Sequence, residues 1–512
     1  GQYCLPFCWE NIAGTYRYDL KNKVDFVKLL ELMEKNDQKK LQLLYYLDQH
    51  PNRKLKNSEL QDKLQISYYL FKRQTKEIAE DIAAFDLSDF FAIEVTNTTV
   101  ILHEYHNTNA SVFLEHYLKQ SLQIKILMTL MHEPPAFNLT EFAEEHFGSY
   151  AFMYKRYTAL RDTLKSWGIV LSNDGKLTGD ELAIRLLLTK IMVVAHIDET
   201  GFDDNVCSTL HELLQLLKMT EATPSMSQLI ETKAYFLISL VRFQQGHVIA
   251  TSPEIVDLVR NIRERTLETR KRVIAIYQAH FTASDQTIDS ECDYFGTFLA
   301  IIGIITSEEI VFPDTIKQHG RAFIQGFEAN FDVQLTLSEK ANIEYVVNKC
   351  LIDVLALPFR SEFFDDHIEV SYFFRMYPEF FDYCQQFVQT RSVKLDRNQS
   401  KFMFYHCLLT LAANVPLNKV LEPLYVCVDF TLGKEYNTII ERDIKYFSTL
   451  NVKVTNEVRP ETKLIITDLV NAYHDTDISK VIWLSPPRPE DWENVIEELL
   501  DLRLADRTVK KA

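Results

Sequence analysis

The segment TEFAEEHFGSYAFMYKRYTALRDTLKSWG (Thr140–Gly168) has the pattern of a short helix, a tight turn and a longer second helix. Ser149 stands just before the second helix, where a serine hydroxyl accepts hydrogen bonds from the unpaired N–H groups of the first turn. The paired cations Lys155 and Arg156 follow early in that helix. A helix of this kind fits the major groove of DNA with its N-terminal half against the base edges. The segment therefore predicts a helix-turn-helix unit that binds DNA.

An earlier segment, SELQDKLQISYYLFKRQTKEIAEDI (Ser58–Ile82), repeats this pattern. Ser67 takes the capping position, and the paired cations are Lys72 and Arg73. The sequence therefore predicts two helix-turn-helix units in one chain.

Each copy is followed by a stretch that alternates apolar and polar residues around a turn. These stretches are FFAIEVTNTTVILHEY (Phe90–Tyr105), which turns at Thr96–Thr98, and IVLSNDGKL (Ile169–Leu177), which turns at Asn173–Gly175. Both patterns are typical of β-hairpins. A hairpin in this position is the wing of a winged helix, so we expect two winged helix-turn-helix domains.

The two candidate DNA-binding helices differ in charge. Ser149–Ser166 carries a net charge of +3, whereas the cations of Ser67–Ile82 are balanced by acidic residues. Positive charge that faces a duplex releases counterions and supplies most of the nonspecific affinity. We therefore expect the second helix to enter the groove and the first to support it. The candidate DNA-contacting residues are Ser149, Tyr150, Lys155, Arg156, Arg161 and Lys165 in the second copy, and Lys72, Arg73 and Lys76 in the first.

Composition limits the class of protein. The 512 residues carry a formal net charge of −17, so any contact with nucleic acid must be local. Only 13 glycines and 15 prolines favour a mainly helical, multidomain chain. No apolar run reaches the length of a membrane span, and no secretory signal is recognised. The eight cysteines, of which only Cys4 and Cys8 lie close together, make no convincing metal site. We expect no cofactor and a reducing, cytoplasmic location.

The rest of the chain changes character twice. Residues 181–415 are almost entirely amphipathic helix, in two blocks that meet near residue 290. Residues 416–512 alternate strand and helix, which predicts a small parallel α/β domain.

The junction after the second hairpin carries a family resemblance. It reads GKLTGDELAIRLLLTKI (Gly175–Ile191): a wing strand, a Leu-x-Gly-x-Glu turn, and a helix with Ile-Arg near its start. This resembles the junction between the DNA-binding and regulatory domains of the Mga/AtxA family, which are transcriptional and virulence regulators of Gram-positive bacteria.

The resemblance implies an order of parts. After an N-terminal segment (1–36) we expect a first winged helix-turn-helix domain (37–107) and a second of the Mga type (108–180). Two helical-bundle domains that resemble phosphotransferase-system regulation domains (PRDs) would follow, at 181–290 and 291–415. The last part (416–512) would resemble the enzyme IIB component of sugar transporters.

The resemblance also implies regulation by phosphate. In the family, PRD histidines accept phosphate from proteins of the sugar phosphotransferase system. The candidates here are His211 and His280 in the first helical block and His406 in the second, chosen from a set that also includes His196, His247, His319 and His367. Cys427 lies near the position of the enzyme IIB phosphocysteine, but Asp429 follows it in place of a glycine-rich loop, so we expect a silent domain kept for association.

The sequence therefore predicts a DNA-binding transcriptional activator rather than an enzyme, since it has no Walker loop and no GxGxxG motif. Its expected partners are double-stranded promoter DNA, a second copy of the chain bound through the IIB-like domain and the PRDs, and the phosphocarrier proteins. The alternative is a PRD regulatory or scaffold protein whose helix-turn-helix units are ordinary helical hairpins that bind protein partners instead of DNA.

Overall fold

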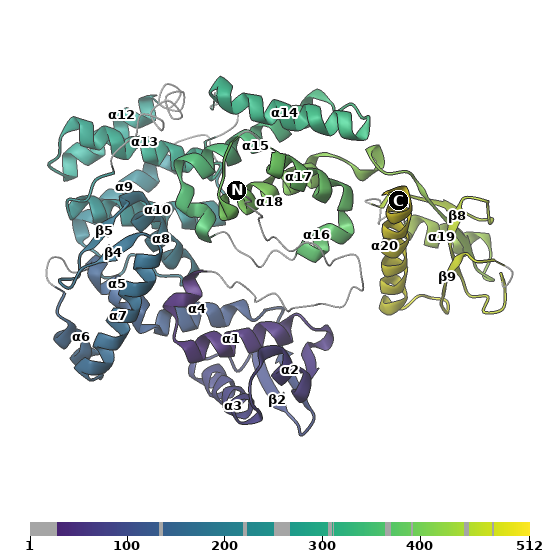
Figure 1. Ribbon diagram of the computed structural model, residues 1–512, viewed down its shortest axis with the longest axis horizontal. Helices are drawn as coiled ribbons and strands as arrows, with labels where there is room; N and C mark the ends of the chain where they lie inside the picture. Colours follow the sequence, from purple (N-terminus) through teal and green to yellow (C-terminus); the bar gives the residue numbers. More distant parts are fainter. Residues whose placement is uncertain are drawn as a thin grey trace, which may run out of the picture. The chain divides into compact units, whose positions relative to one another are not determined.

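The computed structural model describes residues 28–132, 137–218, 223–249, 267–305, 310, 312–363, 370–390, 393–444, 450–473 and 476–511 (Figure 1). Contacts divide the chain into two compact units, Gly1–Glu309 with Glu362–His367 and Ile310–Ser361 with Ile368–Ala512. Most described residues lie in helices, so the expectation of a mainly helical, multidomain chain is confirmed. None of the described helices is long and apolar enough to cross a membrane.

The first unit begins with a group of helices around a small antiparallel sheet. Its elements are η1 (Lys28–Leu32), α1 (Lys35–Asp48), η2 (Pro51–Arg53), β1 (Lys54–Lys56), α2 (Asn57–Leu64), α3 (Tyr68–Ala84), β2 (Phe91–Val95) and β3 (Thr99–Glu104). The strand order is β1-β3-β2, and Val95 pairs with Val100 across the hairpin. The hairpin predicted at Phe90–Tyr105 is confirmed. The sequence did not indicate β1, because a strand of three residues is too short to show a period.

The next elements repeat the order of helix, turn, helix and hairpin. They are α4 (Ser111–Gln120), α5 (Leu122–His132), α6 (Leu139–Glu145), α7 (Tyr150–Ser166), β4 (Ile169–Leu171) and β5 (Leu177–Gly179). β4 and β5 are antiparallel, so the second predicted hairpin is also confirmed. α7 packs against α5, α6 and β4. It does so through a buried stripe at helical spacing: Met153, Tyr157, Leu160 and Leu164.

A helical block completes the described part of the first unit. It contains α8 (Glu181–Val194), α9 (Asp204–Lys218), α10 (Met226–Gln244), α12 (Leu267–His280) and α13 (Asp285–Ile301). The apolar period predicts helix as far as Ile249, but α10 ends at Gln244. Gly246 has a positive φ of 82°, and the His247 N–H donates to the Arg242 carbonyl at 2.9 Å. That is the Schellman ending, which glycine makes without steric cost.

α13 spans the boundary that is expected between residues 290 and 291. The helix runs through this point without a break. Its residue Glu291 is buried and paired with Arg185 of α8, and the first compact unit continues to Glu309. Amphipathic period persists across both helical blocks, so it does not locate the division between them.

The second unit opens with more helices: α14 (Asp314–Phe331), α15 (Leu337–Ala356), η3 (Pro358–Phe363), α16 (Val370–Met376), α17 (Pro378–Thr390), α18 (Arg397–Asn414) and η4 (Leu417–Lys419). α15 packs against α14 and α18. Aromatic residues fill the space between α14 and α17, where the Phe327 and Tyr383 ring centroids are 5.4 Å apart.

The chain ends in a small parallel sheet, as the alternation of strand and helix predicts. Its elements are β6 (Leu424–Asp429), α19 (Lys434–Ile444), β7 (Val452–Thr455), β8 (Thr462–Thr467), β9 (Ser479–Ile482) and α20 (Pro489–Lys511). All pairs in the order β7-β6-β8-β9 are parallel. α20 packs along β8 and β9 and covers a core that includes Ile466, Val481 and Leu499 (Figure 1).

Candidate nucleic-acid interface

Serine caps begin both candidate DNA-binding helices. Ser149 Oγ accepts a hydrogen bond from the Phe152 N–H at 3.3 Å, and Ser67 Oγ accepts one from the Leu70 N–H at the same distance. Each serine is in an extended conformation that ends the preceding turn. The local signal was therefore sufficient to predict where both helices begin.

The cations of α7 fall into two groups. Lys155 and Lys165 are exposed, and within the described ranges no carboxylate lies at ion-pair distance from either ammonium. Arg156 instead points back to the N-terminal part of the unit. Its Nη1 lies 2.5 Å from Glu34 Oε2, and its guanidinium covers the Phe152 ring at 5.1 Å. The charge of Arg156 is thus used inside the protein, which the net charge of the segment did not reveal.

Arg161 and Tyr157 connect α7 to the hairpin. Arg161 Nη1 donates to Asn173 Oδ1 at 3.1 Å, and the Tyr157 hydroxyl donates to the Ser172 carbonyl at 2.5 Å. Burial is the main cause that raises the pKa of Tyr157, to about 12. Both contacts hold the turn of the hairpin against the C-terminal half of α7.

The cations of α3 are mostly paired within their own helix. Arg73 Nε lies 2.8 Å from Glu77 Oε1, and Lys76 Nζ lies 3.4 Å from Glu80 Oε1. The Lys72 ammonium lies over the Tyr68 ring at 5.1 Å. These contacts agree with the balanced charge of the sequence and leave α7 as the more basic surface.

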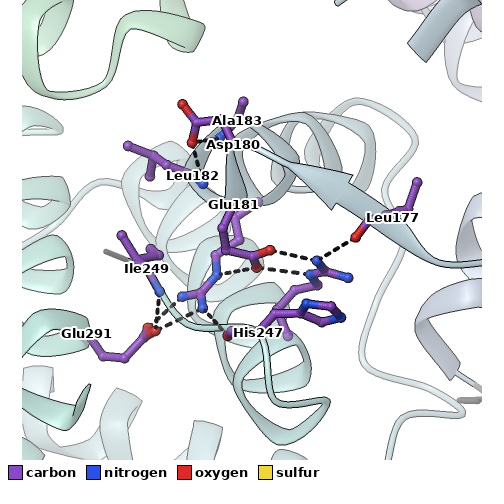
Figure 2. A network of polar contacts seen from close by, with 10 residues as sticks. Leu177, Asp180, Glu181, Leu182, Ala183, His247, Ile249 and Glu291 are labelled. Atoms are coloured by element: carbon purple, nitrogen blue, oxygen red, sulfur yellow. Dashed lines mark hydrogen bonds and ion pairs between the residues drawn. The ribbon is translucent and has the colours of Figure 1, made fainter. Parts of the chain in front are cut away.

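The junction segment Gly175–Ile191 builds a buried polar network (Figure 2). Asp180 caps α8 and accepts from the Leu182 N–H at 2.9 Å. The Glu181 carboxylate accepts from Arg185 Nε at 3.0 Å and from Arg242 Nη2 at 2.6 Å. Burial acts to raise the pKa of Glu181, but the two guanidinium groups outweigh burial and hold it below its usual value.

Arg185 carries the network to α13. Its two terminal nitrogens donate to the two oxygens of Glu291 at 2.5 and 2.9 Å, and Nη2 also donates to the His247 carbonyl at 3.0 Å (Figure 2). Arg185 is fully buried and Glu291 is 2% exposed. Buried charges of this kind are stable only when they are paired and their remaining hydrogen-bonding positions are filled.

Arg242 of α10 joins the network to the hairpin. Its Nη2 donates to the Leu177 carbonyl of β5 at 3.2 Å, beside its bonds to Glu181 (Figure 2). Gly179 ends β5 with φ of +137°, and a Cβ there would lie 2.8 Å from the Gly168 carbonyl oxygen. Leu177, Gly179 and Glu181, the three fixed positions of the Leu-x-Gly-x-Glu turn, thus each have a structural role at the junction.

The candidate phosphorylated histidines differ in access. The His211 side chain on α9 is 58% exposed, with Nε2 3.6 Å from Glu199 Oε1. His280, the last residue of α12, is 18% exposed, and both of its ring nitrogens have partners: Asn205 Oδ1 at 2.9 Å and Glu212 Oε1 at 2.8 Å. Asn205 Nδ2 also donates to the His280 carbonyl, which fixes the orientation of the amide.

His406 is half-buried among the helices of the second unit. It is on α18, and its ring packs against Phe402 with centroids 4.4 Å apart. Burial, with the nearby charges of Lys349 and Arg360, lowers its pKa to about 4. Of the other histidines, His196 Nδ1 lies 2.6 Å from Glu115 Oε2, His247 enters the network through its backbone, His319 is on α14, and His367 lies outside the described residues.

Cys427 is part of the C-terminal core. It stands within β6 with a fully buried side chain, and burial raises the pKa of its thiol to about 11. A thiol with such a pKa is a poor nucleophile near neutral pH. Among the described residues no group of His, Cys, Asp and Glu is arranged to hold a metal ion; Cys4 and Cys8 lie outside those residues.

The sequence did not identify the residues that bind the cations of α7 and the charged residues of the junction. Glu34 binds Arg156, and Asn173 binds Arg161. Arg242 binds Glu181, and Glu291 binds Arg185. The sequence does contain one sign that an acidic partner such as Glu291 exists. Arg185 stands in the apolar run LAIRLLLTKI, and an arginine on a buried face requires an anionic partner. Nothing in the local pattern identifies a partner 106 residues away.

A comparison with known families agrees with this geometry. The model of the Mga helix-turn-helix domain matches residues 106–191, which extend from the end of β3 through α7 and the hairpin to Glu181 and Arg185 of α8. No curated protein sequence matches the chain.

Proposed function

This chain belongs to the Mga family of regulators, and we propose that it controls transcription by binding promoter DNA with α7 in the major groove. The family match itself indicates a DNA-binding transcriptional regulator. The observation that carries the finer proposal is the exposed face of α7, where Lys155 and Lys165 have no ion pair within the described residues. Such cations neutralise phosphates and release counterions.

The two helix-turn-helix units have different roles in this proposal. We interpret α1–β3 and α4–β5 as winged helix-turn-helix domains, because each places a hairpin directly after a serine-capped helix. The cations of α3 are engaged with Glu77, Glu80 and Tyr68. The first domain therefore extends or supports the footprint of the second.

The polar network gives the helical block a rigid connection to the DNA-binding part. α8 begins two residues after β5. Arg242 of α10 binds the Leu177 carbonyl and Glu181. Glu291 of α13 binds Arg185. A shift of α10 or α13 would displace a carbonyl of the wing strand. In this proposal, the PRD-like helices act on DNA binding through these contacts.

Phosphorylation would provide the signal. It adds between about −1.5 and −2 charge at neutral pH. On His211 this charge would face Glu199, and on His280 it would displace the bonds to Asn205 and Glu212. Both changes lie on or beside α9, which packs against α10. We therefore propose the first helical block as the part that receives phosphate from the phosphotransferase system.

The C-terminal sheet offers a surface for a second copy of the chain. Leu432, Val470 and Leu484 are large exposed apolar residues that follow β6, β8 and β9. These strands are parallel neighbours, so their carboxyl ends, and the segments after them that carry the three residues, lie at one edge of the sheet. Exposed apolar residues gathered at one edge are typical of association sites. We propose a homodimer that uses this edge, which presents two pairs of DNA-binding domains.

A salt series tests the DNA proposal. The full-length protein and a Lys155→Ala/Lys165→Ala variant would be titrated on promoter fragments recovered with the native protein from cells. Each lost phosphate contact should lower the slope of log affinity against log salt by about 0.9. The matched control is Lys271→Ala/Arg272→Ala, which removes the same charge from the exposed face of α12. An unchanged slope in the α7 variant rejects α7 as the groove helix. No retention of DNA by the wild type at low salt rejects DNA binding and leaves a regulator that acts on protein partners.

A further inference from the structure

The exposed N-terminal half of α7 is unusually apolar for a surface that faces DNA. Tyr150 and Tyr154 are 55% and 49% exposed, and their rings stack with centroids 6.0 Å apart. Ala151 and Phe152 are exposed between them in sequence, and Lys155 follows directly after Tyr154. The Phe152 ring is engaged with the Arg156 guanidinium. One helical turn separates the tyrosines, so both rings lie along the same side of the helix. We call Tyr150, Ala151 and Tyr154 the apolar strip.

The side chains that usually recognise bases by hydrogen bonding are missing from this surface or are engaged elsewhere. Arginine and lysine make the specific contacts to guanine, and asparagine and glutamine make those to adenine. The two exposed lysines, Lys155 and Lys165, bind phosphates in the proposed function. Tyr150–Ser166 contains no asparagine or glutamine. Of its two arginines, Arg156 pairs with Glu34, and Arg161 donates to Asn173 in the hairpin turn.

The remaining chemistry selects one base. The thymine C5-methyl is the one apolar group among the base-edge groups of the major groove. We propose that the apolar strip binds thymine methyl groups, so that α7 recognises sequence by apolar contact with thymine while Lys155 and Lys165 hold phosphates. This inference rests on the proposed function. The charge of the flanking lysines favours a duplex over a second apolar protein surface as the occupant.

The first domain carries a related feature. Tyr68 and Tyr69 directly follow the Ser67 cap of α3 and are 51% and 78% exposed. Both candidate helices therefore begin with exposed tyrosines. A single ligand, DNA, accounts for both more simply than two separate ligands would.

Replacement of thymine by uracil provides a direct test, because it removes the methyl group and keeps every hydrogen-bonding position of the base pair. The probe would be a duplex selected from a random-sequence pool on the full-length protein, then synthesised with either deoxythymidine or deoxyuridine. We expect the uracil duplex to bind more weakly, by about fourfold for each methyl group that the rings bury. The slope against salt should be the same for both duplexes, since the phosphate contacts are unchanged.

Two variants separate the ring from its hydroxyl. Tyr150→Ala/Tyr154→Ala should bind the two duplexes equally, whereas Tyr150→Phe/Tyr154→Phe should keep the preference for thymine. If the hydroxyls bind phosphate instead, the Phe variant loses affinity equally on both duplexes, at an unchanged salt slope because the hydroxyls are neutral, and the inference is overturned. Equal binding of both duplexes by the wild type also overturns it, with DNA binding itself intact. Failure of the wild type to bind either duplex at low salt rejects the proposed function as well.

Discussion

Arg185 and Glu291 form a two-point ion pair from which water is excluded, with bonds of 2.5 and 2.9 Å between residues 106 positions apart. The pair joins the first helix after the hairpin to the last described helix of the first unit. Arg185 also donates to Glu181 and to the His247 carbonyl, and Glu291 also accepts from the Ile249 N–H. Arg242 then links Glu181 to the Leu177 carbonyl.

Removal of one partner should therefore destabilise the first unit strongly. We expect Glu291→Ala to lower the free energy of unfolding by about 3–5 kcal/mol, because the buried Arg185 would lose its two-point partner and keep only its single bond to Glu181, which Arg242 shares. The double variant Arg185→Met/Glu291→Leu should recover most of this loss, since it removes both charges. Urea denaturation of the full chain measures both. The control Lys271→Ala breaks the exposed pair with Glu268 and should have little effect. A small effect of Glu291→Ala would show that the network contributes little.

Alanine substitution of the neighbouring residues Arg156 and Lys155 of α7 should have different effects, on stability for the first and on DNA binding for the second. Arg156→Ala leaves Glu34 partly buried without a partner, so we expect a loss of about 1–2 kcal/mol in stability and an unchanged salt slope for DNA binding. Lys155→Ala should leave stability unchanged and lower the salt slope by about 0.9. Thermal unfolding and a DNA titration on each variant check this pair. If both variants lower the slope of log affinity against log salt equally, Arg156 binds DNA phosphates as Lys155 does.

His406 should make the second unit sensitive to mild acid. Its pKa falls from 6.5 in the unfolded chain to about 4 in the fold. Its contribution to stability is therefore complete above pH 6.5 and is lost as the pH falls toward 4, since the unfolded chain binds the extra proton. The full contribution is about 3 kcal/mol. Hydrogen exchange in α18 should show a shallower pH dependence for His406→Gln than for the wild type. Identical pH dependences would indicate that the ring titrates normally.

Exposure should decide which histidine of the first block takes up phosphate. His211 is the more exposed, and both nitrogens of His280 already have hydrogen-bond partners. We expect phosphoramidate, or a phosphorylated phosphocarrier protein, to label His211 before His280. Mass spectrometry at alkaline pH, where phosphohistidine survives, identifies the site. His211→Asn should lose the early label and His280→Asn should retain it; the reverse pattern would assign His280.

The carboxyl edge of the C-terminal sheet should control self-association. A two-fold interface contains each residue twice, so Leu484→Lys would remove two buried leucines and add two charges. We expect the dimer dissociation constant to rise by about a hundredfold or more. Leu337→Lys, at an exposed leucine of α15, is the matched control. Sedimentation equilibrium compares the two variants, and a dimer that survives Leu484→Lys uses another surface.

Local signals in the sequence were sufficient for the helix-turn-helix units and not for what connects them. Ser67 and Ser149 act within three residues of their partners, so both caps and both hairpins follow from pattern alone. The parallel sheet also followed, since its strands and helices alternate. The partners Glu34 and Glu291 are brought to their arginines only by tertiary folding. For the same reason a charge count does not distinguish Arg156 from Lys155, and a continuous helical period does not locate a division between the two helical blocks.

The short connection between β5 and α8 affects how this protein folds. Asp180 alone separates the hairpin from the helical block. Beside their bond to each other, Glu181 is paired with Arg242 of α10 and Arg185 with Glu291 of α13. A fragment that stops at residue 180 would lose α8 and leave the Leu177 carbonyl without Arg242. One that stops after α8 would leave Glu181 and Arg185 with only each other, without Arg242 and Glu291. The hairpin and the helical block should therefore melt together, as one cooperative transition. A DNA-binding fragment that is stable alone would have to extend at least through α13.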